Sequence, residues 1–237
     1  MADYDVIIIG GGTAGFSAGM YSSRLGMKTL LVERLIPGGQ IINVERIEDY
    51  PGLPEGISGA DFSSKVQEQA IASGTEFAMS EVTGIRKSGQ EWIVETYEGE
   101  EATKSVIIAG GSTLDKLNVP GENELIGAGV SYCATCDGAF FIDQKVCVVG
   151  GGDSALQEAI TLTEFASNVD LFCRSSSLQA QQILQDRITD HEKIQVHLNV
   201  EVQEIHGDGM VDGVSLLQTV SGESKRVNID GVFIFVG

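Results

Sequence analysis

The sequence predicts an α/β fold that contains two βαβ units, and three observations support this prediction. A short run of β-branched residues ends in three glycines twice, as VIIIGGGTAG at Val6–Gly15 and as VCVVGGGDSA at Val146–Ala155. A helix-like segment follows each glycine loop. A second apolar run then comes at Thr29–Val32 and at Val169–Phe172. This alternation is typical of parallel sheets covered by helices, so we expect two Rossmann-like, three-layer domains.

The stretches between and beyond these units predict one more helix and several strands. The helix is expected over Phe62–Ala72. The segment Leu114–Gly129 is expected to cross between domains, which places the domains at 1–114 and 115–237. Turns are expected at 84–89 and 98–101, and strands at Trp92–Tyr97, Ser105–Ala109, Gln195–Leu198, Val200–Ile205, Val211–Leu217 and Val232–Val236.

Composition and charge exclude several classes of protein. Hydrophobic residues make up 42% of the 237 and charged residues 21%, which excludes wholesale disorder. The 34 acidic and 15 basic residues give a net charge of −19, so we expect no binding to nucleic acid or to anionic membrane surfaces. No apolar run reaches about 18 residues and the N-terminus lacks the pattern of a signal peptide, so a cytoplasmic protein is expected.

The first glycine loop has the spacing of a site for a dinucleotide pyrophosphate. Gly10 permits a tight turn, Gly12 lets the backbone approach the pyrophosphate, and Gly15 allows close packing of helix on strand. The helix that begins at Thr13 and Ala14 offers free N–H groups to phosphate oxygens. The alternative is an ordinary tight turn of an α/β protein.

An acidic residue ends the second strand of the same unit. The carboxylate of Glu33 is placed to accept hydrogen bonds from a ribose diol, which favours FAD or NAD over a 2′-phosphate. Gly39 follows soon after and is expected to admit the flavin side of a cofactor, with Gln40 as a polar contact.

The second glycine loop repeats the fingerprint at Gly150, Gly152 and Ala155, with alanine at the third position. Asp153 and Ser154 begin the helix that follows.

The residues after the second strand of this unit carry a weaker ligand signal. Cys173 stands where an acid would favour NAD, and Arg174 is the only cation for a 2′-phosphate. The alternative is a Rossmann-like domain that no longer binds a nicotinamide cofactor.

The pair Cys133 and Cys136 precedes the second glycine loop as Cys-x-x-Cys. Two thiols at this spacing form reducible disulfides that exchange with other disulfides, and Asp137 is placed to move a proton as a thiolate leaves. A zinc site and two inert buried thiols are the alternatives. The other two cysteines, Cys147 and Cys173, fall in strand-like runs and are expected to pack in the core. No metal site is expected.

The chain resembles the low-molecular-weight thioredoxin reductase family of flavoproteins over nearly its whole length. The resemblance rests on VIIIGGGTAG (6–15), GGQ (38–40), the Tyr-Pro-Gly of 49–52, GVSYCATCDGAFF (129–141) and VVGGGDSALQEA (148–159).

The resemblance implies FAD on the first domain and NADPH on a second domain that is inserted into the first. It implies that Cys136 faces the flavin, that Cys133 attacks the disulfide of a thioredoxin-like partner, and that Asp137 is the acid. It also implies a homodimer, and hinges at Leu114–Asn118 and near Gly237. Asp49 and Ala109 fall at flavin positions of the family.

Four features depart from the family pattern. Asp49 replaces an asparagine, and Ala109-Gly110-Gly111 replaces Ala-Thr-Gly. Only Arg174 remains of three arginines that hold a 2′-phosphate, which argues against NADPH and raises the possibility of a ferredoxin-dependent relative. The family's return to the FAD domain is missing, so an incomplete FAD domain is expected. A non-catalytic nucleotide-binding scaffold or fragment, and a disulfide oxidase that uses oxygen, are the alternative functions.

Overall fold

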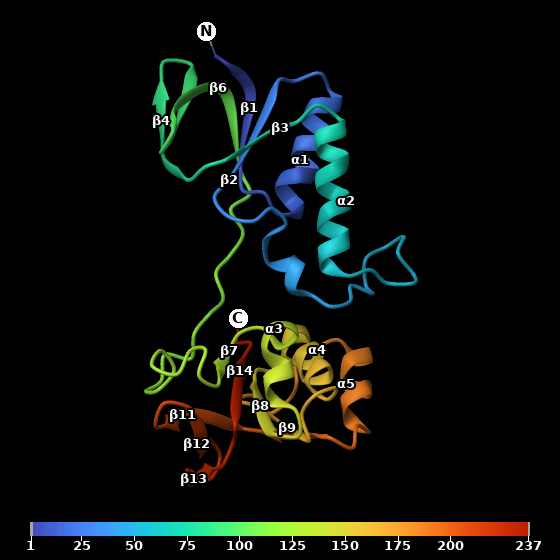
Figure 1. Cartoon of the computed structure of the whole chain (residues 1–237), viewed down its shortest axis with the longest axis vertical. Coiled ribbons are helices and arrows are strands. Elements are labelled where there is room, and N and C mark those ends of the chain that lie inside the picture. Colours follow the sequence, from blue (N-terminus) through green and yellow to red (C-terminus); the bar gives the residue numbers. More distant parts are fainter. Residues whose placement is uncertain (1, 237) are drawn as a thin grey trace. The chain divides into compact units, whose positions relative to one another are not determined.

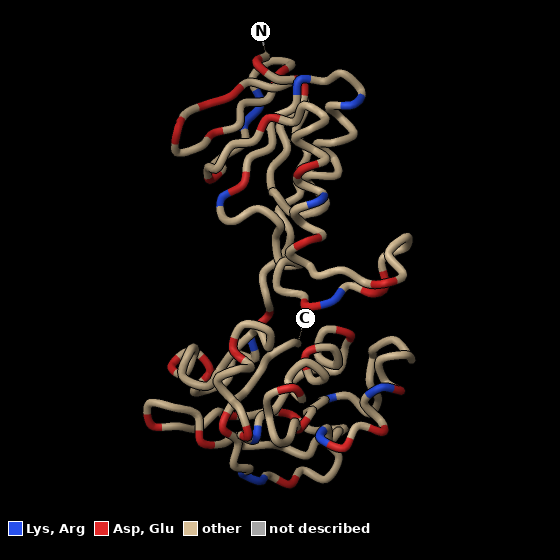
Figure 2. The backbone as a smooth tube through the Cα atoms, turned by 45° about the vertical axis from the view of Figure 1, so that its right-hand side comes forward, with Lys and Arg blue, Asp and Glu red and all other residues tan. Residues whose placement is uncertain are grey.

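The computed structural model describes residues 2–236, so the hinge expected at Gly237 lies outside the described residues. The chain forms two compact units, Met1–Ser112 and Thr113–Gly237 (Figure 1). Acidic residues are distributed along both units (Figure 2).

The first unit is a six-stranded sheet in the order β3-β2-β1-β6-β5-β4. Strands β3, β2, β1 and β6 are parallel, and β6, β5 and β4 form an antiparallel meander. Helices α1 and α2 pack against each other on one side of the parallel strands (Figure 1). The elements are β1 (Tyr4–Ile9), α1 (Thr13–Arg24), β2 (Thr29–Glu33), the 3-10 helix η1 (Gly39–Asn43), α2 (Gly59–Ala72), β3 (Glu76–Met79), β4 (Val82–Ser88), β5 (Glu91–Thr96) and β6 (Gly99–Ile108).

The central strand β1 is buried on both faces, which explains its unbroken apolar sequence. Ile8 packs with Phe16 of α1 and Ala70 of α2 in one core cluster. Ile7 packs with Val94 of β5 in the cluster on the opposite face. The helices and the meander therefore cover the two faces of the same strand.

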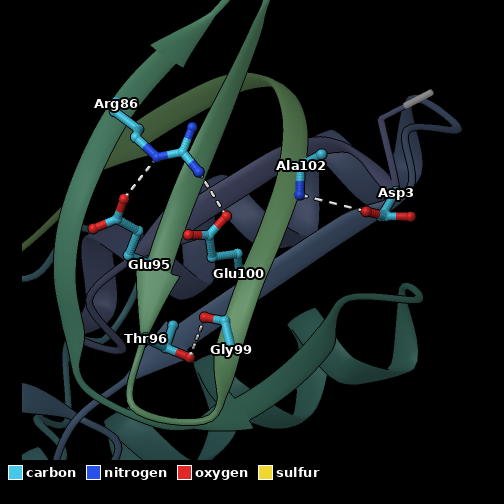
Figure 3. A network of polar contacts seen from close by, with 7 residues as sticks. All are labelled: Asp3, Arg86, Glu95, Thr96, Gly99, Glu100 and Ala102. Atoms are coloured by element: carbon cyan, nitrogen blue, oxygen red, sulfur yellow. Dashed lines mark hydrogen bonds and ion pairs between the residues drawn. The ribbon is translucent and has the colours of Figure 1, made fainter.

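Two predicted turns of the first unit are wrong. Residues 84–88 belong to β4, and the turn lies at 89–90. Gly84 marks a bulge in the strand and not a turn, and a Cβ there would lie 2.5 Å from Glu95 Oε2. The turn expected at 98–101 occupies only 97–98. Glu100 and Glu101 pair with β5, and Arg86 bridges Glu95 at 2.8 Å and Glu100 at 2.6 Å across the meander (Figure 3).

The second unit combines a parallel and an antiparallel sheet. The parallel sheet has the order β10-β9-β8-β14-β7, and the antiparallel sheet has the order β11-β12-β13. The elements are β7 (Val130–Ser131), α3 (Ala134–Asp137), the 3-10 helix η2 (Gly138–Phe141), β8 (Lys145–Val149), α4 (Asp153–Leu162), β9 (Asn168–Cys173), α5 (Gln182–Thr189), β10 (Ile194–Leu198), β11 (Val200–Gly207), β12 (Val211–Gln218), β13 (Ser224–Val227) and β14 (Gly231–Ile234).

Alternate residues of β8 face the two cores of this unit. Val146 and Val148 pack with α4, whereas Cys147 and Val149 pack with the antiparallel sheet. Cys147 and Cys173 are free, buried thiols, as expected. Burial raises the pKa of the Cys147 thiol, so this residue is an inert packing group.

A buried carboxylate links three parallel strands at the second unit's sheet. Asp170 on β9 is 2% exposed, and its two oxygens lie 2.8 Å from Lys145 Nζ on β8 and 2.8 Å from His197 Nε2 on β10. Burial raises the pKa of the Asp170 carboxyl, but the hydrogen bonds and charges of His197 and Lys145 more than offset this and lower it overall. The ionised form of Asp170 therefore stabilises the folded unit.

We predict that Gly15→Ala destabilises the first unit by about 3 kcal/mol, because a Cβ there would lie 1.8 Å from the Gly10 carbonyl oxygen. Denaturant unfolding monitored by circular dichroism measures the loss. Gly12→Ala is the matched control, because a Cβ at Gly12 meets nothing within 4 Å and should leave the stability within about 1 kcal/mol. Equal losses in the two variants contradict the packing role of Gly15.

We predict that Asp170→Asn lowers the free energy of unfolding at pH 7 by about 3 kcal/mol. A lowered pKa contributes stability that is present above the unfolded-state pKa of about 3.9 and is lost as the pH falls through the folded-state value. The difference between wild type and variant should therefore shrink below about pH 4 in urea unfolding series. The control is Asp212→Asn, whose pair with Arg226 is exposed and should contribute under about 1 kcal/mol. A difference that stays constant from neutral to acid pH contradicts the assignment.

Candidate functional site

The first glycine loop contains two positions of close packing and one open position. Gly10 has φ +109°, and a Cβ there would lie 2.2 Å from the carbonyl oxygen of Ala109. A Cβ at Gly15 would lie 1.8 Å from the carbonyl oxygen of Gly10, whereas Gly12 has nothing within 4 Å of its Cβ position. The loop therefore leaves open backbone at the position where the sequence analysis expects the pyrophosphate.

Glu33 reaches back from the end of β2 to this loop. Its Oε2 accepts a hydrogen bond from Gly11 N at 2.6 Å, and its Oε1 accepts one from Leu35 N at 2.8 Å. Each carboxylate oxygen has a second lone pair for a further donor. The acid and the glycine loop thus come together as the sequence predicts, with the carboxylate already oriented by two amides.

The segment around Gly39 lies beside the first glycine loop. Gly12 and Gly38 form a parallel bridge, and a Cβ at Gly39 would lie 3.3 Å from Gly12 Cα. Gln40 Nε2 donates a short hydrogen bond to the carbonyl oxygen of Ser112. Gln40 therefore joins this segment to the chain that follows β6.

Three other predicted residues of the first unit have simpler surroundings. Thr13 is half-buried and Ala14 is exposed at the start of α1. Asp49 is exposed, and within residues 2–236 it has no hydrogen-bond or ion-pair partner. The structure does not join Asp49 to the glycine loop.

The second glycine loop repeats the packing of the first. Gly150 has φ +154°, and a Cβ there would lie 2.1 Å from the carbonyl oxygen of Phe235 and 2.7 Å from the Cβ of Ala155. Gly152 is open in the same way as Gly12. Ser154 is exposed at the start of α4.

The residues beside the second loop differ from those beside the first. Cys173 lies under Gly151, where a Cβ would come within 2.5 Å of its sulfur, in the place that Glu33 takes beside Gly11. Asp153 accepts hydrogen bonds from Gln181 N at 2.6 Å and from Gln181 Nε2 at 2.9 Å. Arg174 is exposed and has no side-chain partner within residues 2–236. The second loop therefore has open backbone at Gly152, and Arg174, which follows Cys173 in sequence, is exposed.

Cys133 and Cys136 form a disulfide at the start of α3. Cys133 is half-buried and is the N-cap of this short helix, whereas Cys136 is exposed. The amide of Cys136 donates to Cys133 Sγ at 3.1 Å. A backbone N–H that points at a sulfur favours negative charge on that sulfur.

Polar groups that the sequence analysis did not identify hold this disulfide segment. Ser131 Oγ donates to Asp137 Oδ2 at 2.6 Å and accepts a hydrogen bond from Cys133 N at 3.1 Å. Glu158 of α4 accepts a hydrogen bond from Ala134 N at 2.9 Å. The Ser131 contacts are local but follow no motif, and Glu158 reaches Ala134 from 24 positions away, so the spacing of the cysteines does not reveal them.

The described residues contain no group of three His, Cys, Asp or Glu side chains placed to hold a metal ion. The histidines have other partners: His197 binds Asp170, and His206 Nε2 lies 2.6 Å from Ser215 Oγ. None of the described helices has the length and hydropathy needed to span a bilayer.

Comparisons with known proteins agree with the resemblance. Residues 4–237 match the family described as pyridine nucleotide-disulphide oxidoreductase. The chain is 47% identical to the thioredoxin reductase of Bacillus subtilis over 99% of this chain and 74% of that protein. It is 45% identical to the thioredoxin reductase of Listeria monocytogenes over 99% of this chain and 73% of that protein.

Solved structures give the same result. The crystal structure of Lactococcus lactis thioredoxin reductase matches 99% of this chain and 78% of its own, with a TM-score of 0.96 and 45% identity. The crystal structure of T. acidophilum thioredoxin reductase matches all of this chain and 78% of its own, with a TM-score of 0.94 and 34% identity.

Proposed function

The chain belongs to the thioredoxin reductase family of pyridine nucleotide-disulphide oxidoreductases, and on this premise we propose that it uses the Cys133–Cys136 disulfide to reduce a thioredoxin-like protein. The observation that carries the proposal is the disulfide itself, which lies at the start of α3 with one sulfur exposed and an amide directed at the other.

We propose that the first unit binds FAD, and several of its groups support this. The open backbone at Gly12, the N–H groups at the start of α1 and the oriented carboxylate of Glu33 would hold the pyrophosphate and the ribose. When bound, FAD would supply the two electrons that reduce the disulfide.

Once reduced, Cys133 and Cys136 can pass the two electrons on by thiol–disulfide exchange. The Cys133 thiolate attacks one sulfur of the partner's disulfide, which forms a mixed disulfide and releases one partner thiolate. The Cys136 thiolate then attacks Cys133 Sγ, which restores the Cys133–Cys136 bond and releases the second partner thiolate. Asp137 is the group that we propose exchanges protons with these thiols, and Ser131 fixes its orientation.

An exposed apolar surface follows the disulfide. Phe140 is 76% exposed and Ile142 is 60% exposed, only a few residues after Cys136. Exposed aromatic side chains are common anchors of protein interfaces. We propose that these two residues contact the thioredoxin-like partner.

The residues around the second glycine loop bear on the identity of the electron donor. Gly152 and the start of α4 fit a pyrophosphate, but Arg174 is the only cation between 173 and 179 for a 2′-phosphate. Cys173 replaces the acid that would favour NADH. Ferredoxins are acidic, so docking one on a chain of net charge −19 is opposed by repulsion. We propose that NADPH is the donor and that Arg174 holds its 2′-phosphate. We also propose that the protein is a homodimer and that it is cytoplasmic.

We predict that Cys136→Ser traps the partner. The prereduced variant should form a one-to-one mixed disulfide between Cys133 and oxidised thioredoxin, because the second thiolate that resolves it is missing. Mass spectrometry under non-reducing conditions measures the adduct. Cys133→Ser should give little adduct, and Cys147→Ala, a change at a buried thiol, should behave as wild type. An adduct only in Cys133→Ser reverses the two roles, and no adduct in any variant refutes thioredoxin as the partner.

We predict that NADPH bleaches the flavin absorbance of the FAD-loaded protein under anaerobic conditions, and that Arg174→Ala weakens this response about ten-fold. The same substitution should leave the response to NADH unchanged, because NADH has no 2′-phosphate. A titration with NADPH, NADH and reduced ferredoxin compares the donors directly. Equal losses for NADPH and NADH contradict the role of Arg174, and bleaching by ferredoxin alone refutes NADPH as donor.

A further inference from the structure

The buried carboxylate of Glu122 binds the residue that directly precedes the disulfide. The side chain of Glu122 is 0% exposed. Its Oε2 accepts a hydrogen bond from Asn118 N at 2.6 Å, and its Oε1 accepts from Leu117 N at 3.0 Å and from Tyr132 Oη at 2.7 Å. Tyr132 directly precedes Cys133.

Burial makes these three hydrogen bonds strong constraints. A buried carboxylate without donors would be very unfavourable, and the half-buried phenol of Tyr132 would lose less by leaving its hydrogen bond unmade, because it is neutral. Within residues 2–236 Glu122 has no cationic partner, so the two amides and the phenol alone satisfy it. The geometry of Leu117, Asn118 and Tyr132 around this carboxylate is therefore fixed.

The turn that presents Glu122 is itself anchored to the antiparallel sheet. Asn118 adopts a left-handed conformation with φ +57°, which asparagine tolerates better than most residues. Ile205 N on β11 donates to the carbonyl oxygen of Pro120 at 2.9 Å. Gly121 passes so close to β11 that a Cβ would lie 1.9 Å from the carbonyl oxygen of Ile205. Glu122 thus sits on a rigid support.

The environment of Tyr132 agrees with this arrangement. Burial, the hydrogen bond to Glu122 and the charge of Glu122 all raise the pKa of the phenol, so it remains a hydrogen-bond donor at neutral pH. Its ring packs against the core cluster that includes Val130 and Leu125.

We propose that Glu122 is a positioning residue for the redox disulfide: its carboxylate holds the phenol of Tyr132, and through it Cys133, at a fixed place relative to the turn at Leu117–Asn118. The proposal rests on the proposed function only in taking Cys133 and Cys136 as the reacting pair.

The effect falls on the oxidised form more than on the reduced form. A disulfide requires both sulfurs in one geometry, whereas two separate thiols do not. A contact that fixes Tyr132, the residue before Cys133, therefore raises the effective concentration of the Cys133 thiol near the Cys136 thiol, which favours the disulfide. Loss of the contact should shift the equilibrium toward the dithiol.

Tyr132→Phe tests this inference because it removes one hydroxyl and keeps the ring in the core. We expect the dithiol to be favoured about five-fold over wild type, the effect of one hydrogen bond. The full chain is equilibrated in buffers of varied reduced-to-oxidised dithiothreitol ratio, and the dithiol fraction is measured by alkylation and mass spectrometry. Glu122→Gln, which keeps the shape but loses one acceptor, should shift the equilibrium in the same direction.

Two control variants separate positioning from general destabilisation. Tyr4→Phe removes a comparable tyrosine–glutamate hydrogen bond, to Glu76, in the first unit. Glu124→Gln removes an exposed charge from the same turn as Glu122. Both should titrate as wild type. An unchanged equilibrium in Tyr132→Phe, or an equal shift in Tyr4→Phe, would overturn the proposal.

A second readout uses the partner. In steady-state reduction of thioredoxin, Tyr132→Phe should lower kcat and leave KM unchanged, because the exposed docking residues are intact; a change in KM alone would overturn the positioning role. The dithiothreitol equilibrium needs neither flavin nor thioredoxin. A five-fold shift in a chain that reduces no thioredoxin would thus refute the proposed function and support the positioning role, and an unchanged equilibrium in an active chain would do the reverse.

Discussion

Both units depend on the same constraint, the close approach of backbone to backbone where a strand passes into a helix. In the first unit Gly10 touches the carbonyl of Ala109, and Gly15 touches the carbonyl of Gly10. In the second unit Gly150 touches the carbonyl of Phe235, and the small side chain of Ala155 completes the contact. Any larger residue would push the helix away from the sheet. The open backbone at Gly12 and Gly152 would then no longer lie at the start of its helix.

Acidic side chains have a second use in this protein besides making it anionic. Glu33 and Glu158 each accept a hydrogen bond from a backbone amide of another segment, and Glu122 accepts from the amides of Leu117 and Asn118 in its own turn and from the phenol of Tyr132. Carboxylates accept several strong hydrogen bonds, so a single side chain can fix a loop that has no regular secondary structure of its own. In the second unit Glu122 and Glu158 bind the residues directly before and after Cys133, so Cys133 lies between two hydrogen-bonded neighbours.

The sequence predicts the parts of this structure that have local signals. The two glycine loops, the strands beside them and α2 follow from periodicity and glycine spacing, and Cys133–Cys136 follows from its motif. Strand β13 was missed because Ser224–Val227 is exposed and has no apolar alternation, and α5 because only Leu184 and Ile188 face the core. The contacts of Glu122 with Tyr132 and of Glu158 with Ala134 were missed because they depend on how the chain folds back, which no spacing records.

The order of strands in the second unit has a consequence for biosynthesis. β14, formed by Gly231–Ile234, lies between β8 and β7 and hydrogen-bonds to both. A ribosome delivers β8 and β9 long before it delivers this central strand. One edge of β8 in the nascent sheet therefore stays unpaired until β14 is synthesised. Strand β7 likewise has no strand to pair with until translation passes residue 234. The six strands of the first unit's sheet, in contrast, are all delivered by residue 108, before β7 and β8.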